Sequence, residues 1–163
     1  YFRMNTRRNI FIGGYIMTNL EYLFNHVRGV SEDIAKTETV APVIHMLTGE
    51  NEVVIGLFDP GTDNLPGAIR SALESVQPWA YVFVGEVNAL SVHPEDISLY
   101  ESGELDIKDS PYLEDYILVT GCERGGSVIG FSAKISGGEG GREVEDWEYM
   151  GEMNGGEAAI GNW

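Results

Sequence analysis

Apolar residues first recur at a regular period just after residue 18, at the three- and four-residue spacing of an α-helix. The run Thr18-Asn-Leu-Glu21 has the form of a capping box, in which side chains satisfy the first backbone N–H groups of a helix. The pattern predicts a helix that starts at Thr18, faces the core on one side, and bends or ends near Gly29. Its apolar stripe comprises Leu20, Leu23, Phe24, Val27, Val30 and Ile34.

Two runs rich in strand-forming residues, 40–47 and 52–58, predict an antiparallel hairpin around the turn Thr48-Gly-Glu-Asn51. Pro42 has no backbone N–H to donate to a ladder, so we expect the first strand to begin at a sheet edge. A loop follows, and Asn64 before Leu65-Pro66 predicts the N-cap of a second helix, which Pro78 stops.

Residues 80–90 form the most hydrophobic segment, and both of its alternating sets of side chains are apolar. Such a strand is buried on both faces, so we expect it at the centre of the sheet. Residues 116–122 and 127–135 predict a second hairpin, and 144–149 a final edge strand. The order α-β-β-α-β-β-β predicts an α+β fold, with a mainly antiparallel sheet of five to six strands and two helices on one face.

The chain has 163 residues, 43% of them hydrophobic, which is typical of a single globular domain. We assign this domain to residues 18–150. Met17 begins a run with the form of a natural start, so residues 1–17 are an N-terminal extension whose native status stays open. Residues 151–163 form a Gly-rich acidic tail, which we expect to be flexible, like residues 137–142.

We expect neither a membrane span nor an export signal. Gly13 and Gly14 interrupt the short apolar run after Arg8, and the rest of the sequence has no apolar stretch of membrane-spanning length. Cys122 is the only cysteine, which excludes an intrachain disulfide and favours a cytoplasmic protein.

The charge balance is strongly acidic, with 26 acidic against 10 basic residues and a net charge of −16. This charge repels phosphate backbones and anionic lipid, so we expect no direct nucleic-acid binding, no membrane binding, and a preference for cationic partners. The acids concentrate in two segments. Residues 95–115 hold eight acids against Lys108, and residues 139–157 hold seven against Arg142.

Three runs carry a resemblance: Val43-Ile-His-Met-Leu47, Val82-Phe-Val-Gly-Glu-Val87 and Tyr116-Ile-Leu-Val-Thr-Gly121. With the order of elements around them, they make residues 38–135 resemble small uncharacterised proteins carried by phages, plasmids and environmental mobile gene cassettes. In those proteins an Ala-Trp pair usually follows the acidic residue of the central strand, whereas this chain has Val87-Asn88. The resemblance implies an α+β fold and no particular activity.

Glu86 and His45 are the candidate catalytic residues. A carboxylate within an apolar central strand must be paired, hydrogen-bonded, protonated or directed into a cavity, which makes Glu86 a candidate acid or base. A neighbouring strand could bring His45 beside it, and a carboxylate–imidazole pair is the minimum for general acid–base chemistry. The structural alternative is that Glu86 pairs with His45 or a backbone N–H, and that His45 is a core or interface residue.

Other residues give weaker signals. Cys122 would be a nucleophile only beside a histidine, and a small buried hydrophobe is the alternative. The three histidines lack metal-ligand spacing, so we expect no metal site. The glycine-rich runs are not followed by Lys-Ser/Thr, so we expect no cofactor.

We expect a non-enzymatic accessory or interaction protein that self-associates and binds a partner through its sheet or its acidic loops. The partner is expected to be a cationic protein or a small molecule. One alternative is a small hydrolase or isomerase that uses Glu86 with His45, and another is an acidic inhibitor or nucleic-acid mimic. Helices on one face would leave apolar strand surface uncovered on the other, which predicts a homodimer or higher symmetric oligomer.

Overall fold

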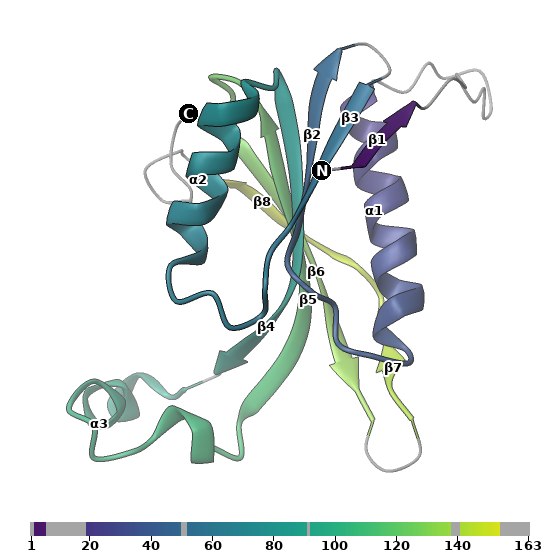
Figure 1. Cartoon of the computed structure of the whole chain (residues 1–163). Coiled ribbons are helices and arrows are strands. Elements are labelled where there is room, and N and C mark those ends of the chain that lie inside the picture. The colour runs from purple at the N-terminus through teal and green to yellow at the C-terminus, as the bar shows by residue number, and fades with distance from the viewer. Residues whose placement is uncertain (1, 6–18, 50–51, 91, 138–140, 154–163) are drawn as a thin grey trace.

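The computed structural model describes residues 2–5, 19–49, 52–90, 92–137 and 141–153 (Figure 1). These residues form eight strands, three α-helices and two short 3₁₀ helices, which confirms the α+β class. The elements are β1 (Phe2–Asn5), α1 (Asn19–Ala35), β2 (Val43–Gly49), β3 (Glu52–Leu57), α2 (Leu65–Val76), β4 (Ala80–Leu90), η1 (Pro94–Asp96), α3 (Ile97–Glu101), η2 (Ile107–Asp109), β5 (Leu113–Glu123), β6 (Val128–Ser136), β7 (Glu143–Val144) and β8 (Glu148–Met153).

The strands form one antiparallel sheet in the order β1-β3-β2-β4-β5-β6-β7, and β8 also pairs with β6. β4 lies in the middle, as its two apolar faces predicted. The sheet has more than the five to six predicted strands, because β1 pairs with β3 and the segment predicted as one edge strand forms both β7 and β8. The edge position expected for β2 is wrong, since β2 begins just after Pro42 and lies between β3 and β4.

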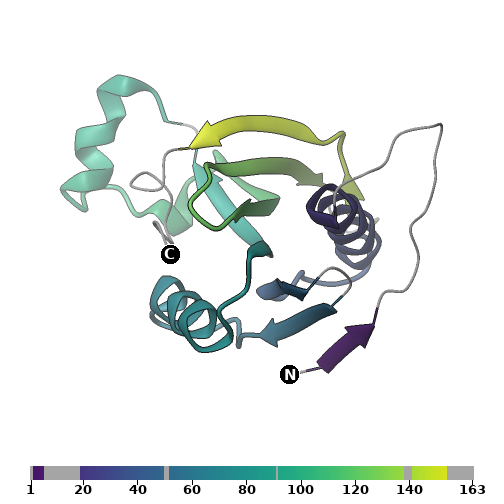
Figure 2. The same cartoon turned by 90° about the horizontal axis from the view of Figure 1, so that it is seen from above.

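The sheet curls, and α1 lies on its concave side (Figure 2). The buried face of the helix shares a core with alternate residues of β4 and β5, such as Val82, Val84 and Val119. Fully burying an aliphatic or aromatic side chain contributes about 1.5–3 kcal/mol, so this core is a main source of stability. The helix contributes Leu20, Leu23, Phe24, Val27 and Ala35 to it.

α2 packs on the opposite face of the same strands (Figure 1). Its Ile69 and Leu73 share a second core with Tyr81 and Phe83, the other alternating set of β4. Successive side chains of a strand point to opposite faces, so the expectation of two helices on one face is wrong. Both faces of β4 are apolar because each one meets a helix.

Because a helix covers each face of β4, the apolar face on which self-association was expected is not exposed there. The apolar side chains of β4 are used inside the chain, in two separate cores. A homodimer therefore stays a prediction, but the uncovered apolar sheet face from which it was argued is not present on β4.

The beginnings and ends of the two long helices follow local chemistry. α1 starts at Asn19, as expected, although Thr18 lies outside the described residues, and it continues through Gly29 without ending. At the start of α2, Oδ1 of Asn64 accepts the Gly67 N–H at 3.1 Å. Gln77 adopts a left-handed conformation, with φ of 55°, and ends the helix before the proline.

Two segments predicted to be flexible are partly described. β8 continues to Met153, so the sheet includes the first residues of the predicted tail, while residues 154–163 lie outside the described residues. The same is true of residues 138–140 in the glycine-rich segment. Among the helices of the described residues, none is both long enough and apolar enough to cross a membrane.

Candidate functional site

Glu86 lies on the face of β4 that α1 covers, and its side chain is 14% exposed. Its Oε2 accepts the backbone N–H of Val40 at 3.1 Å, and its own backbone N–H donates to the carbonyl of Val40 at 3.2 Å. Nη2 of Arg142 lies 2.7 Å from the same Oε2. Nη2 does not meet hydrogen-bond geometry, so this contact is an ion pair. Glu86 thus joins the segment before β2 to the segment before β7.

The structure does not bring Glu86 and His45 together. His45 pairs across the sheet with Val82, four residues before Glu86, which corresponds to about 13 Å along a strand. General acid–base chemistry by such a pair requires hydrogen-bond reach. The described partners of Glu86 are a backbone N–H, which the structural alternative named, and an arginine, which it did not name.

His45 lies on the concave face of the sheet with a largely buried imidazole. Burial, aided by the charge of His26 on α1, lowers its pKa from 6.5 to about 4, and the nearby Val82 backbone opposes this shift only in part. Nδ1 is buried and has no hydrogen-bond partner among the described residues. The ring is therefore neutral at pH 7 and carries one donor and one acceptor.

The lowered pKa of His45 predicts that stability falls in mild acid. In the unfolded chain His45 takes up a proton near pH 6.5, whereas in the folded chain it does so near pH 4. The contribution of His45 to the free energy of unfolding is therefore fully present above pH 6.5 and declines as the pH falls toward 4. We expect a loss of about 2 kcal/mol between pH 7 and pH 5 from this group. Urea unfolding at these pH values measures it.

The matched variant is His45→Phe, which replaces the imidazole with a ring that cannot be protonated. Its stability should change less than that of the wild type between pH 7 and pH 5. His93→Phe changes an exposed histidine outside both cores and serves as the control for loss of an imidazole. Equal acid sensitivity of wild type and His45→Phe would contradict the prediction.

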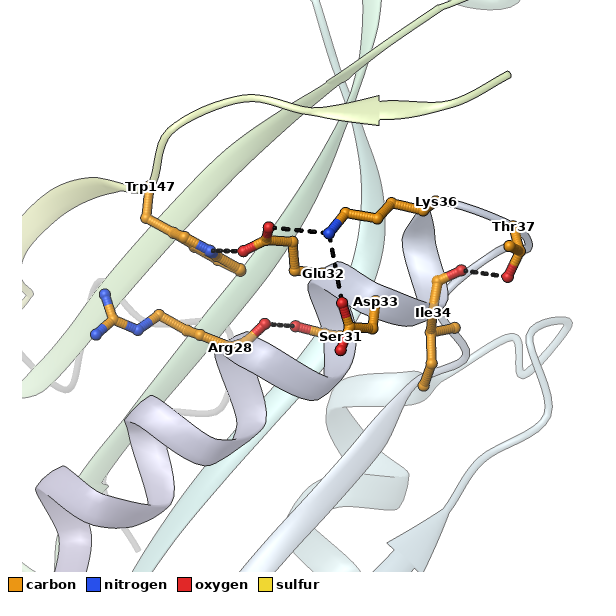
Figure 3. A network of polar contacts seen from close by, with 8 residues as sticks. All are labelled: Arg28, Ser31, Glu32, Asp33, Ile34, Lys36, Thr37 and Trp147. Carbon is orange, nitrogen blue, oxygen red and sulfur yellow. Dashed lines mark hydrogen bonds and ion pairs between the residues drawn. The ribbon is translucent and has the colours of Figure 1, made fainter. Parts of the chain in front are cut away.

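A cavity of about 300 Å³ lies between α1, the segment before β2, and strands β2 and β4. His45, Ser31, Thr39 and Glu38 add polar groups to its lining. The hydroxyl of Ser31 already donates to the carbonyl of Arg28 at 3.0 Å (Figure 3). The walls are mainly apolar and include Val27, Val30, Ile34, Val43 and Val84.

The other flank of α1 is tied to the segment between β7 and β8. There, Nε1 of Trp147 donates to Glu32 at 3.3 Å, and Lys36 forms an ion pair with Glu32 at 3.3 Å (Figure 3). The guanidinium of Arg28 lies 4.2 Å from the centre of the Phe131 ring, a cation–π contact. These contacts hold the helix against one side of the curled sheet, while the cavity lies on the other flank.

A second hollow lies in the acidic excursion, by which we mean residues 92–112 between β4 and β5. The excursion contains α3 and stands away from both α1 and α2 (Figures 1 and 2). Its hollow measures about 350 Å³ and is lined by Val92, His93, Pro94, Asp96, Tyr100 and Tyr112. The hydroxyl of Tyr100 donates to Oγ of Ser110 at 3.1 Å, which braces one ring of the hollow.

The surface of the acidic excursion combines carboxylates with apolar side chains. Glu95, Glu101, Glu104 and Asp106 are exposed. Large apolar side chains are exposed among them, with Tyr112 62% exposed and Ile107 51% exposed; the others are Ile97 and Leu105. Apolar side chains exposed together on one short segment make this segment a candidate contact surface.

Cys122 lies in the core beneath α2 and is 4% exposed. It pairs across the sheet with Tyr81. Burial raises the pKa of the Tyr81 phenol above its usual value, and the neighbouring Cys122 adds to this effect. This position agrees with the alternative of a small buried hydrophobe. Within the residues that the structure describes, no group of three or more His, Cys, Asp or Glu side chains could hold a metal ion.

Two features of these sites were missed from the sequence. Arg142 as partner of Glu86 was not predicted, although it is the only base in the acidic segment 139–157. The tyrosines of the acidic excursion were also missed, and aromatic residues spaced through an acidic loop were the available signal. Comparison of this chain with protein-family models, with the curated proteins and with the solved structures gave no match.

Proposed function

We propose that this chain is a non-enzymatic binding protein whose acidic excursion captures a basic segment of a partner protein. The observation that carries the proposal is the hollow of about 350 Å³, where two tyrosines and a carboxylate converge on a projecting segment. Aromatic rings and carboxylates are the groups that attract Arg and Lys side chains. The hollow therefore suits a cationic side chain.

The surroundings of the hollow suit a partner that is apolar as well as basic. Ile97 and Ile107 are 43% and 51% exposed on the same short excursion. Apolar side chains at the centre of an interface supply affinity, while charges at its rim guide association and set its salt dependence. The net charge of −16 attracts basic proteins over longer distances.

The geometry gives less support to an enzyme. Glu86 is held by Val40 and Arg142, and His45 lies farther along the sheet. An acid–base mechanism needs the two groups within reach of one substrate atom. Binding by the acidic excursion requires no such pairing.

A labelled amphipathic peptide of leucine and arginine tests the proposal by fluorescence anisotropy. We expect binding that weakens as salt is raised, and that is absent for a peptide with glutamate in place of arginine. Tyr112→Ala should weaken binding about fivefold, which corresponds to about 1 kcal/mol for a lost cation–π contact. Asp96→Asn should also weaken it.

Tyr149→Ala is the matched control, because Tyr149 is 57% exposed but lies on β8, away from the acidic excursion. This variant should bind the peptide like the wild type. If Tyr149→Ala weakens binding as much as Tyr112→Ala, the attraction is non-specific and the assigned site is wrong.

A further inference from the structure

One flank of α1 carries apolar side chains that are exposed and do not belong to the core. Val30 and Ile34 are 45% and 36% exposed, although the sequence pattern places both on the core stripe. The buried line of the helix instead passes through Ser31 and Ala35, at 2% and 0% exposure. Ile34 lies on the side of the helix away from Trp147 (Figure 3), and both exposed residues line the cavity of about 300 Å³.

The facing wall of this cavity supplies a polar group that the fold leaves unsatisfied. His45 lines the cavity, and its buried Nδ1 has no hydrogen-bond partner among the described residues. Buried polar groups in native proteins are nearly always hydrogen-bonded, and exceptions call for a specific explanation. A neutral imidazole has one donor and one acceptor, so a hydroxyl group, which can donate or accept, suits either tautomer.

We infer that this cavity binds a small, uncharged, mainly apolar molecule that carries a hydroxyl group, with His45 as its hydrogen-bond partner. The cavity volume lies at the lower end of the range for small-molecule sites, which fits a compound of one or two rings. Apolar walls disfavour a charged ligand, and the carboxylate of Glu38 in the lining disfavours an anion in particular.

This site is separate from the acidic excursion. Its lining comes from α1, β2, β4 and the segment before β2, and it shares no residue with the hollow around Tyr100 and Tyr112. The two proposals therefore stand or fall independently.

Three probes of related shape test the inference: 2-naphthol, 2-methylnaphthalene and 2-naphthoate. Titration of ¹⁵N-labelled protein, followed by NMR, should show shifts centred on Val30, Ile34 and Val84. We expect 2-naphthol to bind at least about fivefold more tightly than 2-methylnaphthalene, because a hydrogen bond contributes about 1 kcal/mol. The carboxylate of 2-naphthoate should make it the weakest of the three.

His45→Phe should remove the preference for 2-naphthol and leave the affinity for 2-methylnaphthalene unchanged. If His45 had only a structural role, the substitution would change the affinities for both probes alike. Ile34→Ser should weaken both neutral probes, whereas Leu57→Ser is the control, since Leu57 is 68% exposed and does not line the cavity. Shifts centred on Tyr100 and Tyr112, no saturable binding, or a preference for 2-naphthol that survives in His45→Phe would each overturn the inference.

Discussion

Gly121→Ala is expected to destabilise the protein by about 3 kcal/mol or more, or to prevent folding. A Cβ atom at this position of β5 would lie 2.2 Å from the carbonyl oxygen of Tyr81 and 3.1 Å from Cα of Val82. It would also lie 3.0 Å from Cζ of Phe24 on α1. Two of these three atoms are backbone atoms of β4, so the central strand itself would have to move.

Chemical denaturation measures this cost, with Gly29→Ala as the control. Gly29 lies within α1, and a Cβ atom there would meet no atom within 4 Å. This second substitution should stabilise the protein by about 0.5–1 kcal/mol, because alanine favours a helix over glycine.

A combined variant separates the two sources of the clash. Adding Phe24→Leu to Gly121→Ala should not restore stability, because the nearest atom is the Tyr81 carbonyl and not the phenyl ring. A Gly121→Ala protein within about 0.5 kcal/mol of the wild type would show that α1, β4 and β5 do not pack this closely.

Glu86→Leu is expected to cost about 1–3 kcal/mol, because it removes an acceptor from one group and a counter-charge from another. The N–H of Val40 would lose its acceptor, and Arg142, which is 26% exposed, would lose its ion pair. Glu86→Gln should cost less, since the amide oxygen can still accept the Val40 N–H.

A double-mutant cycle isolates the ion pair from the backbone hydrogen bond. Glu86→Leu and Arg142→Leu, measured singly and together by urea unfolding, should be less destabilising together than the sum of the single variants. Additive costs would show that the two side chains do not interact. Equal costs for Gln and Leu would show that the negative charge itself, rather than an acceptor oxygen, is what the fold requires.

The strands and helix ends could be predicted because their signals lie within a few residues. The apolar character of both faces in 80–90 marked β4, and Asn64 followed by Pro66 marked the start of α2. Hairpin connections made the antiparallel pairing of β2 with β3 and of β5 with β6 a local consequence of short turns.

The placement of the helices could not be read in the same way. The apolar faces of β4 indicated that both sides of the strand are buried, but a helix on each face and a second copy of the chain would account for this pattern equally well. Which face α2 covers depends on the path of its connections, and the stripe of each helix would fit either side. The expectation of two helices on one face failed at this point.

By itself the sequence determined the class of fold, the central strand and the N-cap of α2, because periodicity and capping act between near neighbours in the chain. It also identified Glu86 and His45 as the polar residues of the sheet that need an explanation. Only the tertiary structure decided their partners, since Glu86 meets Val40 and Arg142 from distant parts of the chain, and His45 meets a cavity beneath Val30 and Ile34. Such contacts arise from the curl of the sheet around α1, which no local pattern specifies.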